Sequence, residues 1–332
     1  MRRAALVMLL AAASASTATA QEASTELYGA FRYSYNHADP GDSTHWASAN
    51  NASRLGVRGE LSDGGLTAFF DLQTGVNIDA ETIGGAFTQR YYFAGVRGGF
   101  GTVSIGRQST AYKMAGLRMD PFYDSSTLSA GGGVPTTGLF AGASFGLSNL
   151  TNGFADRTLS YTSPSLGGIT ANAAAYIDTD SDHDYGLGIG YRAHGIDAGV
   201  QYHEVDAGRT WASTLGVDHA VRGHAGFARQ GVFSLGTSLE RVEAVTGETQ
   251  DFLYAAGTVN VTPRVALAGG VGHVEDSGAV QPVAGTAFHT GVFFSLFPQM
   301  RLHALFSHLD AAAGPDRANL GAGLTYQFVL GR

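Results

Sequence analysis

The sequence predicts an all-β fold: a transmembrane antiparallel β-barrel, counted at 16 strands, with a polar interior. The first observation is a period-two alternation, repeated along the chain, between an apolar face and a face that is polar, charged or small. The second is that short glycine-containing turns alternate with longer polar connections. Charge on one face and apolar side chains on the other indicate a wall with lipid on one side and water on the other.

The first 20 residues have the pattern of a cleaved export signal. Two arginines after the initiating Met form a basic start, an apolar run follows over residues 4–13, and Ala18-Thr19-Ala20 is a small-x-small cleavage site. The apolar run is too short for a membrane-spanning helix. We therefore expect residues 1–20 to be a signal peptide and residues 21–332 to form one barrel domain.

The alternation is clearest between Ser53 and Gln108, where four short segments are joined by glycine-rich turns. In one of them, Phe70 and Leu72 share a face while Asp71 and Gln73 lie on the other. The same pattern continues to the end of the chain. Strands are expected near 26–37, 50–60, 65–76, 87–97, 101–108, 156–163, 168–178, 184–194, 196–206, 210–221, 231–245, 250–261, 264–274, 286–297, 300–309 and 318–330.

Two stretches do not follow the simple pattern. The alternation is irregular over 220–231, and an 18-strand arrangement remains open there. The connection from Ser109 to Ala155 has no clear strand and contains Pro121 and a run of three glycines. Stretches this long without regular structure are usually functional or disordered, and in a barrel the functional option is a loop folded into the lumen.

Composition excludes several classes of function. The chain has no cysteine, which excludes disulfides, thiolate metal sites and cysteine nucleophiles. The formal net charge is −8, whereas a nucleic-acid partner requires a basic face. We therefore expect no nucleic-acid partner.

Five short phrases occur in a characteristic order and spacing. They are Leu27-Tyr28-Gly29, Ser53 to Gly59, Gly64 to Phe70, Gly99 to Val103 running into Gly106-Arg107-Gln108, and Tyr161 to Gly168. Over essentially its whole mature length the chain resembles the general porins of Gram-negative bacterial outer membranes, which are trimers of 16-strand barrels. The resemblance implies an outer-membrane homotrimer, surrounded by lipid and lipopolysaccharide, that forms a passive water-filled channel for small hydrophilic solutes and ions.

In that family the third long loop folds inward and places acids opposite a ladder of wall arginines. The resemblance implies that residues 109–155 are this constriction loop here, and it implies a pore role for the acids and the arginines that match. The loop acids are Asp120 and Asp124; the wall arginines are Arg54 and Arg90, with Arg32 and Arg58 on the same face by parity.

The chain departs from the family in three places. The strand after the loop offers only Ser160 and Thr162 to the lumen, and the loop itself carries Lys113 and Arg118. These differences leave the preference for anions or cations open. The chain also continues past Phe328 into Val329–Arg332, where the family usually ends on an aromatic residue, so assembly would depend on an internal signal.

A run of alternating acids resembles a calcium loop and is the one metal candidate. It lacks the glycine and the distal glutamate of an EF-hand, so a solvated outer loop is the simpler interpretation, with a weak Ca²⁺ or lipopolysaccharide-bridging site as the alternative. No other cofactor is expected. The candidate ligands are Asp178, Asp180, Asp182 and Asp184.

Two other functions remain open. The first is an outer-membrane hydrolase, since His273, His289, His303 and His308 gather in the last strands, but no local phrase encodes a nucleophile with an oriented histidine. The second is a structural or adhesive barrel without conductance. Small, glycine-rich lumen faces on several strands favour an open interior instead. A non-enzymatic channel is therefore the prediction.

Overall fold

The computed structural model describes residues 22–39, 45–78, 86–123, 125, 143–177, 184–205, 216–276, 278 and 280–331. The predicted signal peptide lies outside these residues. The strands are β1 Glu22–Asp39, β2 His45–Asn50, β3 Arg54–Asp63, β4 Leu66–Val76, β5 Phe87–Gly98, β6 Gly101–Gln108, β7 Ala155–Thr162, β8 Ile169–Tyr176, β9 Asp184–Ala193, β10 Ile196–Glu204, β11 Val217–Arg229, β12 Phe233–Ala244, β13 Thr249–Asn260, β14 Val265–Val274, β15 Gly285–Phe297, β16 Met300–Ala311 and β17 Arg317–Leu330. The helices are α1 Ala111–Leu117 and the 3-10 turn η4 Asn149–Thr151.

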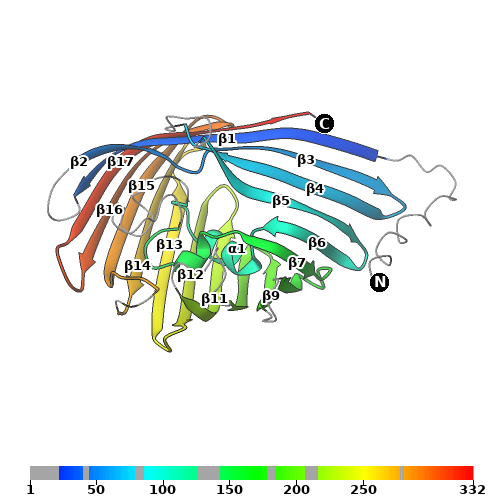
Figure 1. The fold of residues 1–332 in the computed structure, drawn as a ribbon. Coiled ribbons are helices and arrows are strands. Elements are labelled where there is room, and N and C mark those ends of the chain that lie inside the picture. The colour runs from blue at the N-terminus through cyan, green and yellow to red at the C-terminus, as the bar shows by residue number, and fades with distance from the viewer. Residues whose placement is uncertain are drawn as a thin grey trace.

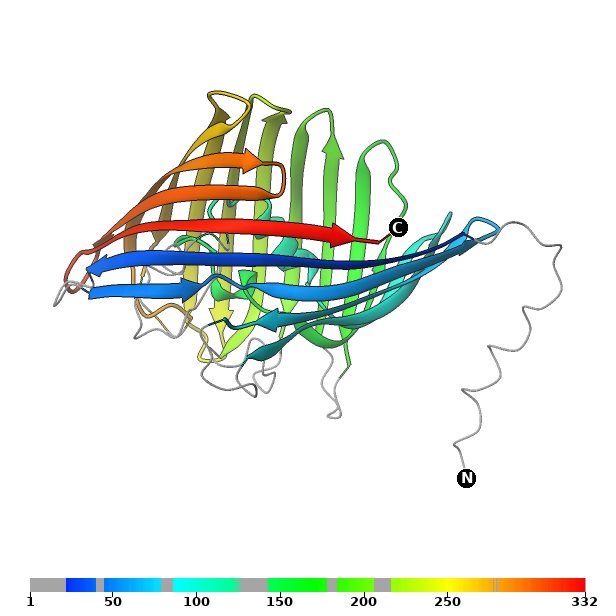
Figure 2. The same cartoon turned by 90° about the horizontal axis from the view of Figure 1, so that it is seen from above.

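The strands form a closed antiparallel barrel. From β3 onward each strand pairs with its sequence neighbours, and β1 closes the sheet by pairing with β17 from Leu27↔Leu330 to Asp39↔Ala318. On its other edge β1 pairs with β2 and then with β3 (Figure 2), so these two segments form one wall strand interrupted at residues 51–53. The described chain therefore forms a 16-strand barrel, as predicted.

The irregular stretch near 220–231 is a single strand and its turn. β11 runs from Val217 to Arg229, so the 18-strand alternative is wrong and the strand expected at 210–221 was placed too early. The reason is that Gly223 and Ala225 occupy outward positions where the pattern expects large apolar residues. Their pairing with β10 and β12 is nevertheless regular.

The two faces of the wall have the expected chemistry. Outward positions carry exposed apolar side chains such as Phe31, Leu187 and Leu239, whereas inward positions carry buried polar ones such as Ser34, Gln201 and Glu240. Lipid-facing and lumen-facing residues alternate because successive side chains of a strand point to opposite faces. Among the described residues, no helix is long and apolar enough to cross a membrane.

The described parts of the long loop lie against the inner face of the wall. Figure 1 shows α1 within the curve of the strands, and α1 contacts β9, β10 and β11. The helix begins where the Thr110 hydroxyl accepts a hydrogen bond from the Lys113 amide. The segment therefore occupies the interior rather than extending outward.

Glycines on the inner wall allow the loop backbone to approach closely. A Cβ built on Gly272 of β14 would lie 1.7 Å from the carbonyl oxygen of Phe145, and Gly146 itself has a positive φ of 95°. Nearby, Phe122 of the loop packs with Ala268, Phe293 and other buried residues. The small residues that favoured an open interior in the sequence therefore accommodate the loop on the β11–β15 side.

Candidate functional site

The four predicted wall arginines, two from the family resemblance and two added by parity, line one cavity. Arg32 comes from β1, Arg54 and Arg58 from β3, and Arg90 from β5, and all four line a cavity of about 440 Å³ between this wall and α1. Their convergence follows from antiparallel pairing, since β1 lies beside β3 and β4 separates β3 from β5. The grouping expected of these side chains is present, while their role in conduction stays a prediction.

Hydrogen bonds fix two of these guanidinium groups. Arg58 Nε donates to Glu26 at 2.7 Å. Arg90 Nε donates to the Gln73 side-chain oxygen at 2.6 Å. Gln73 in turn donates from Nε2 to the Tyr28 hydroxyl at 2.9 Å. These contacts hold the cations at set positions on the wall.

Lys113 adds a cation from the opposite side of the cavity. It lines the cavity from α1, and its Nζ lies 3.8 Å from the centroid of the Phe154 ring and donates to the Asn152 carbonyl at 3.1 Å. The sequence showed Lys113 as a departure from the family pattern but not as a pore residue. Its place became visible only with the loop docked, although its proximity to the helix cap at Thr110 was a local signal.

The charges around this cavity are strongly unequal. Five cationic side chains line it, and among the described lining residues the one carboxylate is Asp71, which accepts a hydrogen bond from the Tyr28 hydroxyl. Glu26 lies outside the lining and pairs with Arg58, so the described lining carries more positive than negative charge. Low-dielectric walls focus the field of like charges that line a cleft. The arrangement therefore favours anions in the cavity and opposes cations.

Of the two predicted loop acids, Asp120 is not among the residues that line this cavity. Asp120 is buried, accepting hydrogen bonds from the Ser144 amide at 2.8 Å, the Phe122 amide at 2.9 Å and the Tyr254 hydroxyl of β13 at 2.8 Å. Burial raises the pKa of Asp120. In this position the carboxylate attaches the loop to the wall. Asp124 lies outside the described residues, and a constriction role for either acid stays a prediction.

A buried ion pair makes the main attachment of the loop. Glu240 of β12 accepts from the Tyr112 hydroxyl at 2.6 Å, the Ser148 amide at 3.0 Å and Arg222 of β11 at 2.7 Å. The side chains of Arg222 and Glu240 are 0% and 1% exposed. Arg222 also donates to the Tyr112 carbonyl at 2.7 Å. Local sequence patterns could not predict this network, because Glu240 is 92 to 128 residues away from its loop partners.

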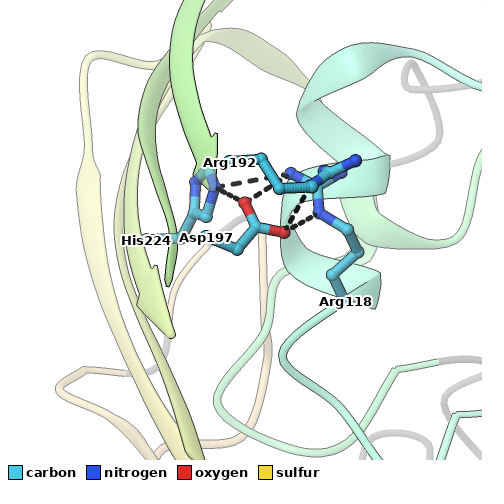
Figure 3. A network of polar contacts seen from close by, with 4 residues as sticks. All are labelled: Arg118, Arg192, Asp197 and His224. Carbon is cyan, nitrogen blue, oxygen red and sulfur yellow. Dashed lines mark hydrogen bonds and ion pairs between the residues drawn. The ribbon is translucent and has the colours of Figure 1, made fainter. Parts of the chain in front are cut away.

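A second network attaches the end of α1 to the wall. Figure 3 shows Asp197 of β10 between three basic side chains: Arg118 Nε at 2.6 Å, Arg192 Nε at 3.2 Å and His224 Nε2 at 3.3 Å. Arg118, noted in the sequence only as an unusual loop cation, thus forms an ion pair between the end of α1 and the wall strand β10. Asp197 compensates its charge there.

The structure leaves the calcium prediction open. Asp178, Asp180 and Asp182 lie outside the described residues, and Asp184 is a buried residue of β9 that pairs with Tyr176. Elsewhere, Asp218, His219 and Glu243 bring ligand atoms within 4.8 Å of one another. His219 Nδ1 lies 2.8 Å from Asp218 and its Nε2 3.5 Å from Glu243.

Neither His289 nor His273 shows a serine–histidine–acid arrangement in the described structure. His289 Nδ1 lies 2.9 Å from the Ser307 hydroxyl, but its buried Nε2 has no hydrogen-bond partner among the described residues. A catalytic histidine needs an acid on the ring nitrogen opposite the nucleophile. His273 contacts Thr286 at 2.9 Å instead of an acid.

Comparisons with known proteins agree with this architecture. The model of a family described as Gram-negative porin matches residues 4–329. The fold is similar to the anion-selective porin from Comamonas acidovorans, with 19% identity, a TM-score of 0.70, and coverage of 92% of this chain and 100% of that one. It is also similar to the trimer form of OmpT, an outer membrane protein of Vibrio cholerae (16% identity, TM-score 0.65, 92% and 99% covered), and to Salmonella typhi OmpF in complex with daunomycin (14%, 0.61, 93% and 97%). A search of curated proteins finds no match.

Proposed function

We propose an anion preference for this chain, which belongs to the Gram-negative porin family and forms an outer-membrane channel for passive diffusion of small hydrophilic solutes and ions. The observation that carries the proposal is the described lining of the 440 Å³ cavity, which holds five cationic side chains, one of them paired with Glu26, and one carboxylate, Asp71. Similarity to a porin whose name states anion selectivity supports it.

The physical basis is the field at a narrow opening. Two unit charges about 4 Å apart interact by about 4 kcal/mol at an effective dielectric near 20. An anion beside two or three of these cations is therefore stabilised, and a cation is repelled. Salt screens such fields over a Debye length of about 8 Å at physiological ionic strength. The preference should consequently be strongest in dilute salt.

The test is the reversal potential of single channels in a planar bilayer under a KCl gradient. The reversal potential of the wild type should have the sign expected when chloride permeates more readily than potassium. Arg54→Gln and Lys113→Gln should each move this potential toward zero. Arg241→Gln is the matched control, because Arg241 pairs with Asp251 on the exposed outer face. A potential of the potassium sign in the wild type would contradict the proposal.

We further propose that the functional unit is a homotrimer without enzymatic activity, surrounded by lipid and lipopolysaccharide. Each chain is exported with a signal peptide that is cleaved after residue 20. The trimeric form of a similar protein supports the assembly. On this chain Tyr35 and Trp46 are exposed and stack at 5.2 Å on β1 and β2, offering aromatic surface to a neighbour. Conductance that closes in three equal steps is the expected result; single-step closures and a monomeric mass would contradict the trimer.

The absence of enzymatic activity is tested separately. His289 and Ser307 form the nearest approach to a nucleophile and base among the described histidines of the last strands. We expect purified protein to hydrolyse neither ester nor peptide substrates. Hydrolysis that disappears in Ser307→Ala would overturn this part of the proposal.

A further inference from the structure

A second cavity lies inside the barrel at the end that carries the short turns. It has a volume of about 250 Å³ and is lined by Pro121 of the loop and by residues from the ends of β13 to β16 and the 262–264 turn. Short turns are periplasmic in outer-membrane barrels, so this cavity lies on the periplasmic side of the loop. It shares no lining residue with the 440 Å³ cavity.

The charge of this second cavity comes from two arginines. Arg264, which is exposed, and Arg301 line it, and its described lining residues include no carboxylate. Arg301 is half-buried and lies over the Phe293 ring at 4.4 Å from its centroid. Neither arginine forms an ion pair with an acid in the described part of the chain. A half-buried guanidinium without a counterion is costly unless an anion from solution supplies the partner.

Neutral polar groups complete the lining. Thr258, Asn260 and Ser295 occupy inward positions of β13 and β15, and Thr262 lies in the turn before β14. The Thr262 hydroxyl oxygen accepts from the amides of Arg264 at 3.2 Å and Val265 at 3.0 Å, which leaves its own proton for donation. Hydroxyl and amide donors beside two planar guanidinium groups match the oxygen atoms of a phosphate or a carboxylate.

The described acid of the loop, Asp120, is already engaged. Asp120 precedes Pro121, but its carboxylate accepts hydrogen bonds from Ser144, Phe122 and Tyr254. Stacking on Phe293 holds Arg301 in place without neutralising it. We propose that this periplasmic-side cavity is a binding site for one small oxyanion, a phosphate or a carboxylate, held by Arg301 and Arg264.

The test is calorimetric titration of the folded, detergent-solubilised protein with inorganic phosphate and, separately, with succinate at constant ionic strength. The expected result is saturable binding of one oxyanion per chain, at least tenfold weaker in Arg301→Gln and in Arg264→Gln. Arg241→Gln is the matched control and should bind as the wild type does, because Arg241 pairs with Asp251 on the outer face. Arg54→Gln shows whether the arginine wall contributes to the measured binding. Migration of unheated protein in detergent gels verifies that each variant is folded.

Three outcomes would overturn the site: no saturable binding in the wild type, undiminished binding in both Arg301→Gln and Arg264→Gln, or loss of binding in Arg54→Gln alone. The last result would place the oxyanion at the arginine wall. The inference does not depend on the anion preference of the channel. Reversal potentials of the same variants distinguish failure of this site from failure of the anion preference. If the titration fails but the wild-type reversal potential still has the chloride sign, only the oxyanion site is overturned.

Discussion

Replacing Glu240 with glutamine removes the charge at the centre of the loop attachment while keeping the size of the side chain. In the wild type its carboxylate accepts from Tyr112, Ser148 and Arg222, and both members of the ion pair are buried. Removing one partner of a buried pair costs about 3–5 kcal/mol, because the other charge is left uncompensated. When the loop undocks, water can reach Arg222 and solvate its charge. The substitution should therefore lower the free energy of loop opening by about the same amount.

The expected effect is large enough to measure directly. Each 1.4 kcal/mol changes an equilibrium about tenfold, so 3–5 kcal/mol corresponds to an increase of about a hundredfold to a few thousandfold in loop opening. Hydrogen–deuterium exchange of the amides of α1, measured by mass spectrometry, should rise by that factor. Open-channel current noise should increase in parallel.

Asp251→Asn supplies the matched control from the neighbouring strand. It breaks the pair with Arg241, which follows Glu240 on β12 but points outward with a side chain 68% exposed. Exposed pairs contribute about 0–1 kcal/mol. If α1 exchanges at the wild-type rate in Glu240→Gln, or equally fast in Asp251→Asn, burial of the pair does not control loop docking.

Two further predictions concern the loop. In Gly272→Ala the new Cβ meets the Phe145 carbonyl oxygen, so the loop must shift at a cost of about 1–3 kcal/mol; exchange of residues 143–148 should rise, while Gly269→Ala on the same strand, whose Cβ has its nearest neighbour at 4.0 Å, should change nothing. Because the folded pKa of Asp120 lies above its usual 3.8, the folded protein binds a proton first as pH falls. Stability from this group should therefore increase on acidification from above the folded pKa to below 3.8, and decrease in the reverse direction. Asp120→Asn should lose that slope in urea unfolding at pH 4 to 7, and an unchanged slope would show that other groups cause it.

Period-two alternation was enough to predict the wall. It placed Arg32, Arg54, Arg58 and Arg90 on one face, and antiparallel pairing of neighbouring strands then brought them together. Such inference works because both steps are local. The strand that corresponds to β11 was predicted too early in the sequence, because Gly223 and Ala225 occupy outward positions but are small.

The loop could not be predicted in the same way. Its position depends on contacts between Tyr112 and Glu240, which are 128 residues apart, and on the shape of β14 at Gly272. The same glycine pattern that suggested an empty lumen is what a closely docked backbone requires. Asp120, expected opposite the arginines, instead satisfies backbone amides and Tyr254, and no feature of its sequence neighbourhood distinguishes these two environments.

Phe154 gives the arginine wall a property that an acid could not. Its ring lies 3.8 Å from the charge of Lys113, 4.9 Å from that of Arg90 and 5.4 Å from that of Arg107. An aromatic quadrupole attracts cations but carries no net charge. The ring thus contacts all three cations and does not reduce their total positive charge. A carboxylate at position 154 would hold the same cationic groups but would cancel part of their field. The aromatic ring holds the cations in place without neutralising them.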